Sequence, residues 1–233
     1  MKVYRNEWKY LLSEASLSSM ESRLRAVLEV DENSNSQGIY EIHSLYFDDF
    51  KDSSLKENDA GISIRYKYRI RYYGDDLSYI RLEKKEKNNG LCHKESCMLT
   101  MDEYQTIISG DVSNLIYDSD KALLRHFAME MLTRGFKPKA IVDYERVAFV
   151  EPVTNVRITI DRNISVSEAF DEFLTGDYLR YPVVDKLKNV LEVKFDDILP
   201  GYVRAVINER NLVQTSFSKY YLGRKQLKNM GRY

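Results

Sequence analysis

Four basic residues alternate with apolar and aromatic ones in the first half of the segment 61–87. Arg65, Lys67, Arg69 and Arg71 take odd positions, and isoleucines and tyrosines fill the even positions from 64 to 72. Successive side chains of a β-strand point to opposite faces, so this pattern predicts a strand with one cationic face. Arginine forks and lysine ammonium groups commonly pair with phosphate oxygens. The predicted chemistry is phosphate binding, and a solvated surface hairpin is the plain alternative.

The same pattern, an apolar face opposite a charged face, recurs on most of the predicted strands. The charged faces together hold thirteen cations and four acids, whereas the whole chain has a net charge of −1. Positive charge is therefore expected to concentrate on one surface. The candidate lining is Arg5, Glu7, Lys9, Arg65, Lys67, Arg69, Arg71, Arg81, Glu83, Lys85, Lys94, Arg146, Arg157, Asp161, Glu192, Lys194 and Lys219.

The few acids within this basic set suggest a metal. Mg²⁺ and similar ions often take only one or two protein carboxylates, together with water and substrate phosphates. A highly charged phosphate chain bound with Mn²⁺ or Mg²⁺ is the resulting hypothesis. The alternative is that Glu83 and Glu192 only pair with neighbouring cations.

Other chemistries find less support in the sequence. The three histidines, His43, His93 and His126, are scattered and form no zinc-binding pattern. A G-x-x-x-x-G-K-[ST] motif is absent, which disfavours a P-loop kinase. The tyrosines could stack on bases, but most are expected on the faces opposite the cations, so no specific nucleic-acid partner is predicted.

Periodicity predicts the elements that position these residues. Strands are expected at 3–10, 39–47, 91–99, 139–150, 156–161 and 190–195, with a hairpin inside 61–87 that turns at 74–76. Helices are expected at about 16–29, 100–110, 119–134 and 202–209, with a polar loop at 31–38 and a helical or irregular stretch at 166–176.

These elements predict an α+β fold: a closed eight-stranded antiparallel β-barrel with flanking helices, formed by residues 1–233 as a single domain. The apolar strand faces would pack outward against the helices, and the charged faces would line the interior. No secretory signal or transmembrane segment is apparent. Cys92 and Cys97 do not form a disulfide framework, so a cytoplasmic location is the default expectation.

An ordered series of motifs resembles a known family. The series is RNEWKY (5–10), SLYFDD (44–49), YRIRYYG (68–74), RLEKK (81–85), a lone Lys94, DYERVAF (143–149), VRITID (156–161), LEVK (191–194) and FSKY (217–220). It resembles the vacuolar transporter chaperone (VTC) catalytic domain, a polyphosphate polymerase of the triphosphate tunnel metalloenzyme, or CYTH-like, superfamily. The resemblance covers nearly the whole chain.

The resemblance implies a tunnel enzyme that transfers the γ-phosphoryl group of ATP to a growing polyphosphate chain. It implies a metal ligand at Glu192, with Glu7 as an ambiguous second acid. Lys67, Glu83, Lys194 and Ser218 would contact substrate in the same tunnel. The implied catalytic phosphate-binding set is Lys9, Arg69, Arg71, Lys85, Lys94, Arg146, Arg157 and Lys219.

Two positions depart from the family patterns. Arg5 stands where the Glu-x-Glu-x-Lys pattern of the superfamily's hydrolases has its first glutamate, as in the polymerase branch, and Ser216 replaces a lysine of the eukaryotic polymerase. Two alternatives to the polymerase therefore stay open: hydrolysis of inorganic or nucleoside triphosphate in the same tunnel, and a catalytically silent polyphosphate-binding module. Coupling to a membrane or a partner protein is not encoded in these residues.

Overall fold

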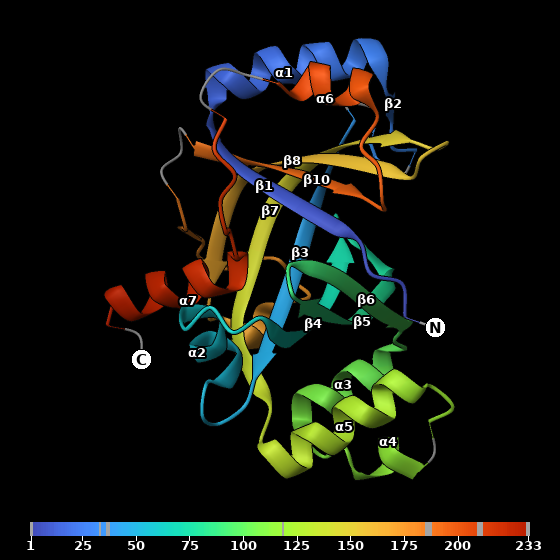
Figure 1. Cartoon of the computed structure of the whole chain (residues 1–233). Coiled ribbons are helices and arrows are strands. Elements are labelled where there is room, and N and C mark those ends of the chain that lie inside the picture. The colour runs from blue at the N-terminus through green and yellow to red at the C-terminus, as the bar shows by residue number, and fades with distance from the viewer. Residues whose placement is uncertain are drawn as a thin grey trace.

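One antiparallel sheet dominates the computed structural model, which describes residues 2–32, 34–35, 38–117, 119–184, 188–208 and 212–231. Eight strands follow one another across the sheet in the order β1-β10-β8-β7-β3-β4-β5-β6, while β2 pairs with β7 and β9 with β8 (Figure 1). The strands are β1 (Asn6–Ser13), β2 (Glu29–Val30), β3 (Ile39–Asp48), β4 (Ile64–Tyr73), β5 (Asp76–Asn88), β6 (Leu91–Met98), β7 (Lys137–Glu151), β8 (Val156–Ser167), β9 (Tyr181–Pro182) and β10 (Lys188–Phe195).

The two edges of this sheet approach each other at one point. Arg5, just before β1, and Cys92 of β6 exchange two backbone hydrogen bonds of 2.9 Å. No longer ladder joins β1 to β6 within the described residues. The α+β fold with an antiparallel sheet and flanking helices is confirmed, but closure of the barrel is not.

Seven α-helices and a short 3-10 helix flank the sheet in the described part of the chain. Figure 1 shows α1 and α6 together at one end, α3, α4 and α5 grouped beyond β5 and β6, and α2 beside α7. The helices are α1 (Glu14–Val27), α2 (Ser53–Asp59), α3 (Met101–Ser109), α4 (Ser113–Tyr117), α5 (Ala122–Arg134), α6 (Gly201–Ile207) and α7 (Lys219–Asn229), and the 3-10 helix is Phe170–Glu172.

Local signals in the sequence set several helix boundaries. The Ser13 side chain accepts a hydrogen bond from the backbone of Ser16 at the start of α1. Thr100 and Glu103 form the expected capping box at the start of α3. Gly110 and Gly135, with φ of 81° and 65°, end α3 and α5 in the left-handed conformation that glycine tolerates.

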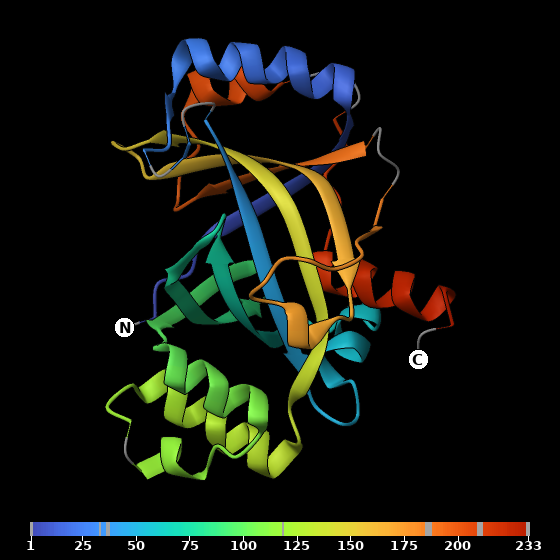
Figure 2. The same ribbon diagram turned by 180° about the vertical axis from the view of Figure 1, so that it is seen from behind.

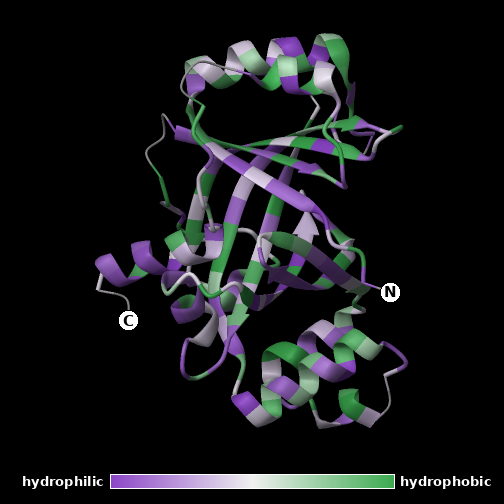
Figure 3. Ribbon diagram, viewed as in Figure 1, coloured by the Kyte–Doolittle hydropathy of each residue, from purple (hydrophilic) through white to green (hydrophobic). Residues whose placement is uncertain are grey.

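The apolar strand faces point outward, as predicted. One buried cluster joins β3, β4 and β5 to α3, α4 and α5, and a second joins β1, β7, β8 and β10 to α1 and α6. A third places α7 against β3, β7 and β8. Figure 2 shows the long strands β3, β7 and β8 from behind, and Figure 3 shows hydrophilic and hydrophobic residues alternating along the strands. The opposite, charged face is left to line the concave side.

The structure adds elements that periodicity did not predict. β2, β9, α2, α4 and α7 were not expected, and β8 extends to Ser167, into the stretch predicted to be helical or irregular. The helix predicted at 202–209 spans Gly201–Ile207, and Glu209 lies outside the described residues, as do three positions of the predicted loop 31–38. Among the described helices, none has the length and hydrophobicity needed to cross a bilayer.

Candidate active site

A basic cavity occupies the concave side of the sheet. Its volume is about 950 Å³, and thirteen lysines and arginines but only two glutamates line it in the described structure. Of the predicted site residues, it is lined by Glu7, Lys9, Lys67, Arg69, Arg71, Lys85, Lys94, Arg146, Arg157, Glu192, Lys194, Ser218 and Lys219; the further lining cations are Arg5, Arg65 and Lys87. Arg81 is not in the lining, because its guanidinium stacks on the ring of Tyr79, 4.1 Å from the centroid.

Strand register brings the central cations together. β4 pairs with β5 so that Lys67 lies opposite Lys85, and Lys85 in turn lies opposite Lys94 of β6. Residues directly opposite on antiparallel strands share a face. Like charges in this arrangement repel one another, so the face needs either internal acids or an anionic ligand.

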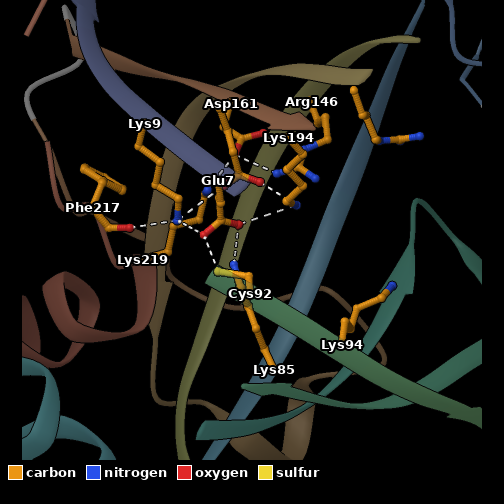
Figure 4. Close-up of polar contacts among 12 residues, drawn as sticks. Glu7, Lys9, Lys85, Cys92, Lys94, Arg146, Asp161, Lys194, Phe217 and Lys219 are labelled. Carbon is orange, nitrogen blue, oxygen red and sulfur yellow. Dashed lines mark hydrogen bonds and ion pairs between the residues drawn. The ribbon is translucent and has the colours of Figure 1, made fainter. Parts of the chain in front are cut away.

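A lysine–glutamate cluster, formed by Glu7, Glu192, Lys9, Lys85 and Lys194, occupies one wall of the cavity. Figure 4 labels Glu7, Lys9, Lys85 and Lys194 of this cluster. Lys85 Nζ lies 2.6 Å from Glu7 Oε1, and Lys194 Nζ lies 2.6 Å from Glu192 Oε1. Lys9 Nζ lies between the two acids, 3.2 Å from Glu192 Oε2 and 3.5 Å from Glu7 Oε2. The Lys9 ammonium group therefore lies close to both carboxylates.

The cluster keeps both acids ionised. Burial and the charge of Glu192 raise the pKa of Glu7, but the neighbouring lysines outweigh them and hold that pKa below its ordinary value. Burial likewise raises the pKa of Glu192, and Lys194 and Lys9 more than offset it. Burial lowers the pKa of Lys9, but the two glutamates raise it above 10.5.

Glu83 lies beneath the cavity lining rather than in it. Its side chain is fully buried and pairs with Arg69 Nη2 at 2.6 Å, Lys94 Nζ at 3.0 Å and Arg71 Nη1 at 3.9 Å. Burial raises the pKa of Glu83, but Arg69, Arg71 and Lys94 hold it well below its ordinary value. The expectation that Glu83 lines the tunnel is therefore wrong: its carboxylate instead orients the cations above it.

Asp161 occupies a similar buried position on the opposite side. Its two carboxylate oxygens accept hydrogen bonds of 2.6 and 2.8 Å from Arg146, and Lys219 Nζ lies 2.5 Å from Asp161 Oδ2 (Figure 4). Burial raises the pKa of Asp161, but Arg146 and Lys219 lower it to about 2. Asp161 was expected in the lining, but it too lies underneath.

Several tyrosines also face the cavity, although most aromatic residues in the described part of the chain do not line it. Arg69 donates a 2.9 Å hydrogen bond to the Tyr46 hydroxyl. Arg71 donates one of 2.7 Å to Tyr144. β3 carries no lysine or arginine, so the sequence did not indicate which face of the sheet Tyr46 would take. Tyr144 shares the parity of Arg146 on β7, so its position on the cavity face could have been predicted.

Arg157 is held at another part of the lining by two residues that sequence reasoning also missed. It donates a 2.7 Å hydrogen bond to the hydroxyl of Tyr40 and forms an ion pair with the buried carboxylate of Asp31. Asp31 lies in the predicted polar loop, which carried no sign of a contact with β8.

The start of α7 completes the cavity wall. Lys9 Nζ donates a 2.9 Å hydrogen bond to the carbonyl of Phe217, and Ser218 caps α7 by accepting a hydrogen bond from the backbone of Tyr221. Tyr220 anchors the helix through a 2.6 Å hydrogen bond to Asp48. A helix N-terminus favours anions, so this placement adds to the positive potential of the cavity.

The cavity offers few metal ligands. No group of three or more His, Cys, Asp or Glu residues suited to hold a metal occurs among the described residues. Glu7 and Glu192 are both ionised, and both lie close to Lys9 and therefore near each other. Two carboxylates fit a metal ion that completes its coordination shell with phosphate oxygens and water. These residues suit a metal that arrives with its phosphate substrate better than a resident metal.

Comparison with known protein families identifies the family of this chain. The VTC domain family matches residues 4–228. The chain belongs to the VTC domain family. The resemblance inferred from the motif series is therefore confirmed, and no curated protein sequence matches this VTC domain.

Solved structures share the fold of this VTC domain at low sequence identity. A putative adenylyl cyclase from Hippeastrum, reported to have a dominant triphosphatase activity, matches with a TM-score of 0.57 and 14% identity over 95% of this chain and 96% of its own. A putative adenylate cyclase from Bacillus halodurans matches with a TM-score of 0.52 and 11% identity over 100% of this chain and 92% of its own. These similarities establish a shared fold.

Proposed function

We propose that this VTC domain is a metal-dependent polyphosphate polymerase, in which the γ-phosphoryl group of ATP passes to the end of a polyphosphate chain inside the basic cavity. One observation carries the proposal: in the described part of the chain, thirteen lysines and arginines and two ionised glutamates surround a space of about 950 Å³. Such a space suits a ligand with closely spaced negative charges. Family membership favours the same chemistry.

Phosphoryl transfer depends mainly on positioning and charge neutralisation, so no side-chain nucleophile is required. In the proposed step, an oxygen at the chain end bonds to the γ-phosphorus as the bond to the bridging oxygen of ADP breaks. Arg69 and Arg71 are held by Glu83, Tyr46 and Tyr144, so their guanidinium groups are oriented before substrate binds.

Glu192, with Glu7 beside it, would hold Mn²⁺ or Mg²⁺ against the phosphate oxygens. When bound, the metal neutralises part of the charge on the transferring phosphoryl group. Lys9, Lys85 and Lys194 hold the two carboxylates before substrate enters, and these lysines would then turn to phosphate oxygens. Lys94, Arg146, Arg157 and Lys219, which face the same space, are proposed to bind the rest of the chain.

Hydrolysis of a triphosphate is the second candidate. One observation favours it: Ser216 lines the cavity where the eukaryotic polymerase carries a lysine, so one cation is absent from the path of a growing chain. The triphosphatase activity reported for the Hippeastrum protein is consistent with this candidate.

Incubation of the purified protein with ATP and Mn²⁺ distinguishes these functions. Polymer is followed on a gel stained for polyphosphate, and phosphate release is measured in the same samples. The polymerase predicts long polymer that falls at least about a hundredfold in Glu192→Gln, because charge stabilisation of phosphoryl transfer is worth several kcal/mol. Glu95→Gln, a change at an exposed glutamate on β6, is the matched control and should leave the polymer unchanged.

Phosphate without polymer would instead identify a hydrolase. Salt-sensitive binding of polyphosphate without turnover would identify a binding module.

A further inference from the structure

Lys67 differs from the cavity lysines that hold carboxylates. Lys9, Lys85, Lys94, Lys194 and Lys219 each form an ion pair with a glutamate or aspartate. Among the described residues, no acid forms an ion pair with Lys67. Its amine donates hydrogen bonds to two neutral oxygens, Asn58 Oδ1 at 3.1 Å and Ser218 Oγ at 2.9 Å.

The groups that face Lys67 are mostly cations. Arg65 lies two residues away on β4, Lys85 lies opposite on β5, and Lys9 approaches from β1. Asp48, at the end of β3, is the nearby acid, but its carboxylate already accepts hydrogen bonds from the backbone of α2 and from the hydroxyl of Tyr220. The Tyr220 ring lies 5.3 Å from Lys67 Nζ.

This environment opposes a charge on Lys67 while the cavity holds no anion. Burial, followed by the repulsion of Arg65, Lys9 and Lys85, lowers the pKa of Lys67 from 10.5 to about 7. A neutral amine still has the two N–H groups needed for the bonds to Asn58 and Ser218, so both contacts persist without the third proton. A phosphate chain would reverse the balance, because nearby negative charge favours the ammonium form.

We propose that Lys67 is a proton-linked phosphate contact: its amine takes up one proton from solvent when a phosphate chain enters the cavity, and the resulting ammonium binds phosphoryl oxygens. The step converts R–NH₂ and H⁺ to R–NH₃⁺ and makes or breaks no other bond. Ser218 links this contact to the N-terminus of α7, since the hydroxyl that accepts from Lys67 also caps the helix. The inference rests on the proposed function only in requiring that the cavity binds phosphate chains.

The consequence is a dependence of phosphate affinity on pH. A group that gains a proton on binding makes affinity rise as pH falls. From a pKa of about 7, Lys67 is about nine-tenths neutral at pH 8 and about one-tenth neutral at pH 6. The proton uptake should therefore be large at pH 8 and almost absent at pH 6.

Calorimetric titration with inorganic tripolyphosphate, without metal, tests this inference. Measurements in buffers of different ionisation enthalpy give the number of protons taken up per ligand, and the ligand's own protons cancel when proteins are compared. At pH 8, wild type should take up about 0.9 more protons than Lys67→Arg, whose guanidinium is always charged, and at pH 6 only about 0.1 more.

Two further variants complete the design. Lys67→Met should also lack this proton uptake and should bind tripolyphosphate more weakly. This variant keeps the test decisive if an arginine at position 67 disrupts the fold. Lys84→Arg changes a lysine of β5 that lies outside the cavity lining and contacts His126, and it should keep the wild-type proton number.

Equal proton numbers in wild type and both Lys67 variants would overturn the inference and leave the proposed function standing. Failure of wild type to bind tripolyphosphate at all would overturn both.

Discussion

Replacement of Glu83 by glutamine should destabilise the protein strongly, although the two side chains have nearly the same shape. The Glu83 carboxylate is fully buried and holds Arg69 and Arg71, whereas Lys94 is 47% exposed and adds little. Removing one partner of a buried ion pair costs about 3–5 kcal/mol. For a chain of this length, about 2–4 °C per kcal/mol gives a fall in melting temperature of roughly 6–20 °C.

Thermal unfolding followed by circular dichroism measures this effect. Glu95→Gln, at an exposed ion pair with Lys2, is the control and should cost less than about 1 kcal/mol. Saturating tripolyphosphate should stabilise Glu83→Gln more than wild type, because the ligand supplies the negative charge that Arg69 and Arg71 have lost. A melting temperature of Glu83→Gln equal to that of the control would refute the assignment of Glu83 as the buried counter-charge.

Three smaller perturbations test other parts of the structure. Asp161 has a pKa of about 2 against the usual 3.8, so its contribution to stability is present above about pH 4 and is lost as pH falls through 2. Asp161→Asn should therefore flatten the dependence of stability on pH between about pH 4 and pH 2 in acid unfolding. An unchanged acid unfolding curve would contradict the buried pairing of Asp161. Gly223→Ala would place a Cβ 3.0 Å from Val166 and should lower the free energy of unfolding, measured with denaturant, by about 1–3 kcal/mol. Gly201→Ala, which has open space around its Cβ, is the control and should be nearly neutral. Similar costs for both variants would argue against tight docking of α7. Thr100→Ala removes the cap of α3 and should cost about 1 kcal/mol by the same assay; an unchanged stability would contradict a stabilising role for this cap.

Alternation of residue types was enough to predict most of the sheet and of the cavity lining. Arg69 and Arg71 share a parity on β4, and parity decides the face of every residue on a regular strand. The same rule placed Lys85, Lys94 and Lys194 on the concave side, where the structure has them. These strands pack their opposite faces against helices, so the hydrophobic pattern fixed which face turned inward.

The parity of a residue on a strand could not predict whether its side chain lines the cavity or lies buried beneath the lining. Glu83 and Asp161 share the faces of lining cations but lie underneath them, because the acidic side chains are shorter and pair with the guanidinium and ammonium groups of the longer basic ones. Nor could it predict α7, whose sequence KYYLGRKQLKN is mostly polar and contains a central glycine. Buried contacts such as that of Tyr220 with Asp48, far away in the sequence, hold this helix in place.

The central claim is that the γ-phosphoryl group of ATP becomes part of a phosphate chain inside the cavity. The most direct test is incubation of the wild-type protein with Mn²⁺ and ATP labelled with ³²P at either the γ or the α position, followed by separation of polymer, nucleotide and orthophosphate. The account predicts γ-label in long polymer, α-label only in nucleotide, and ADP formed in proportion to the polymer. Recovery of all the γ-label as orthophosphate, with none in polymer, would contradict it.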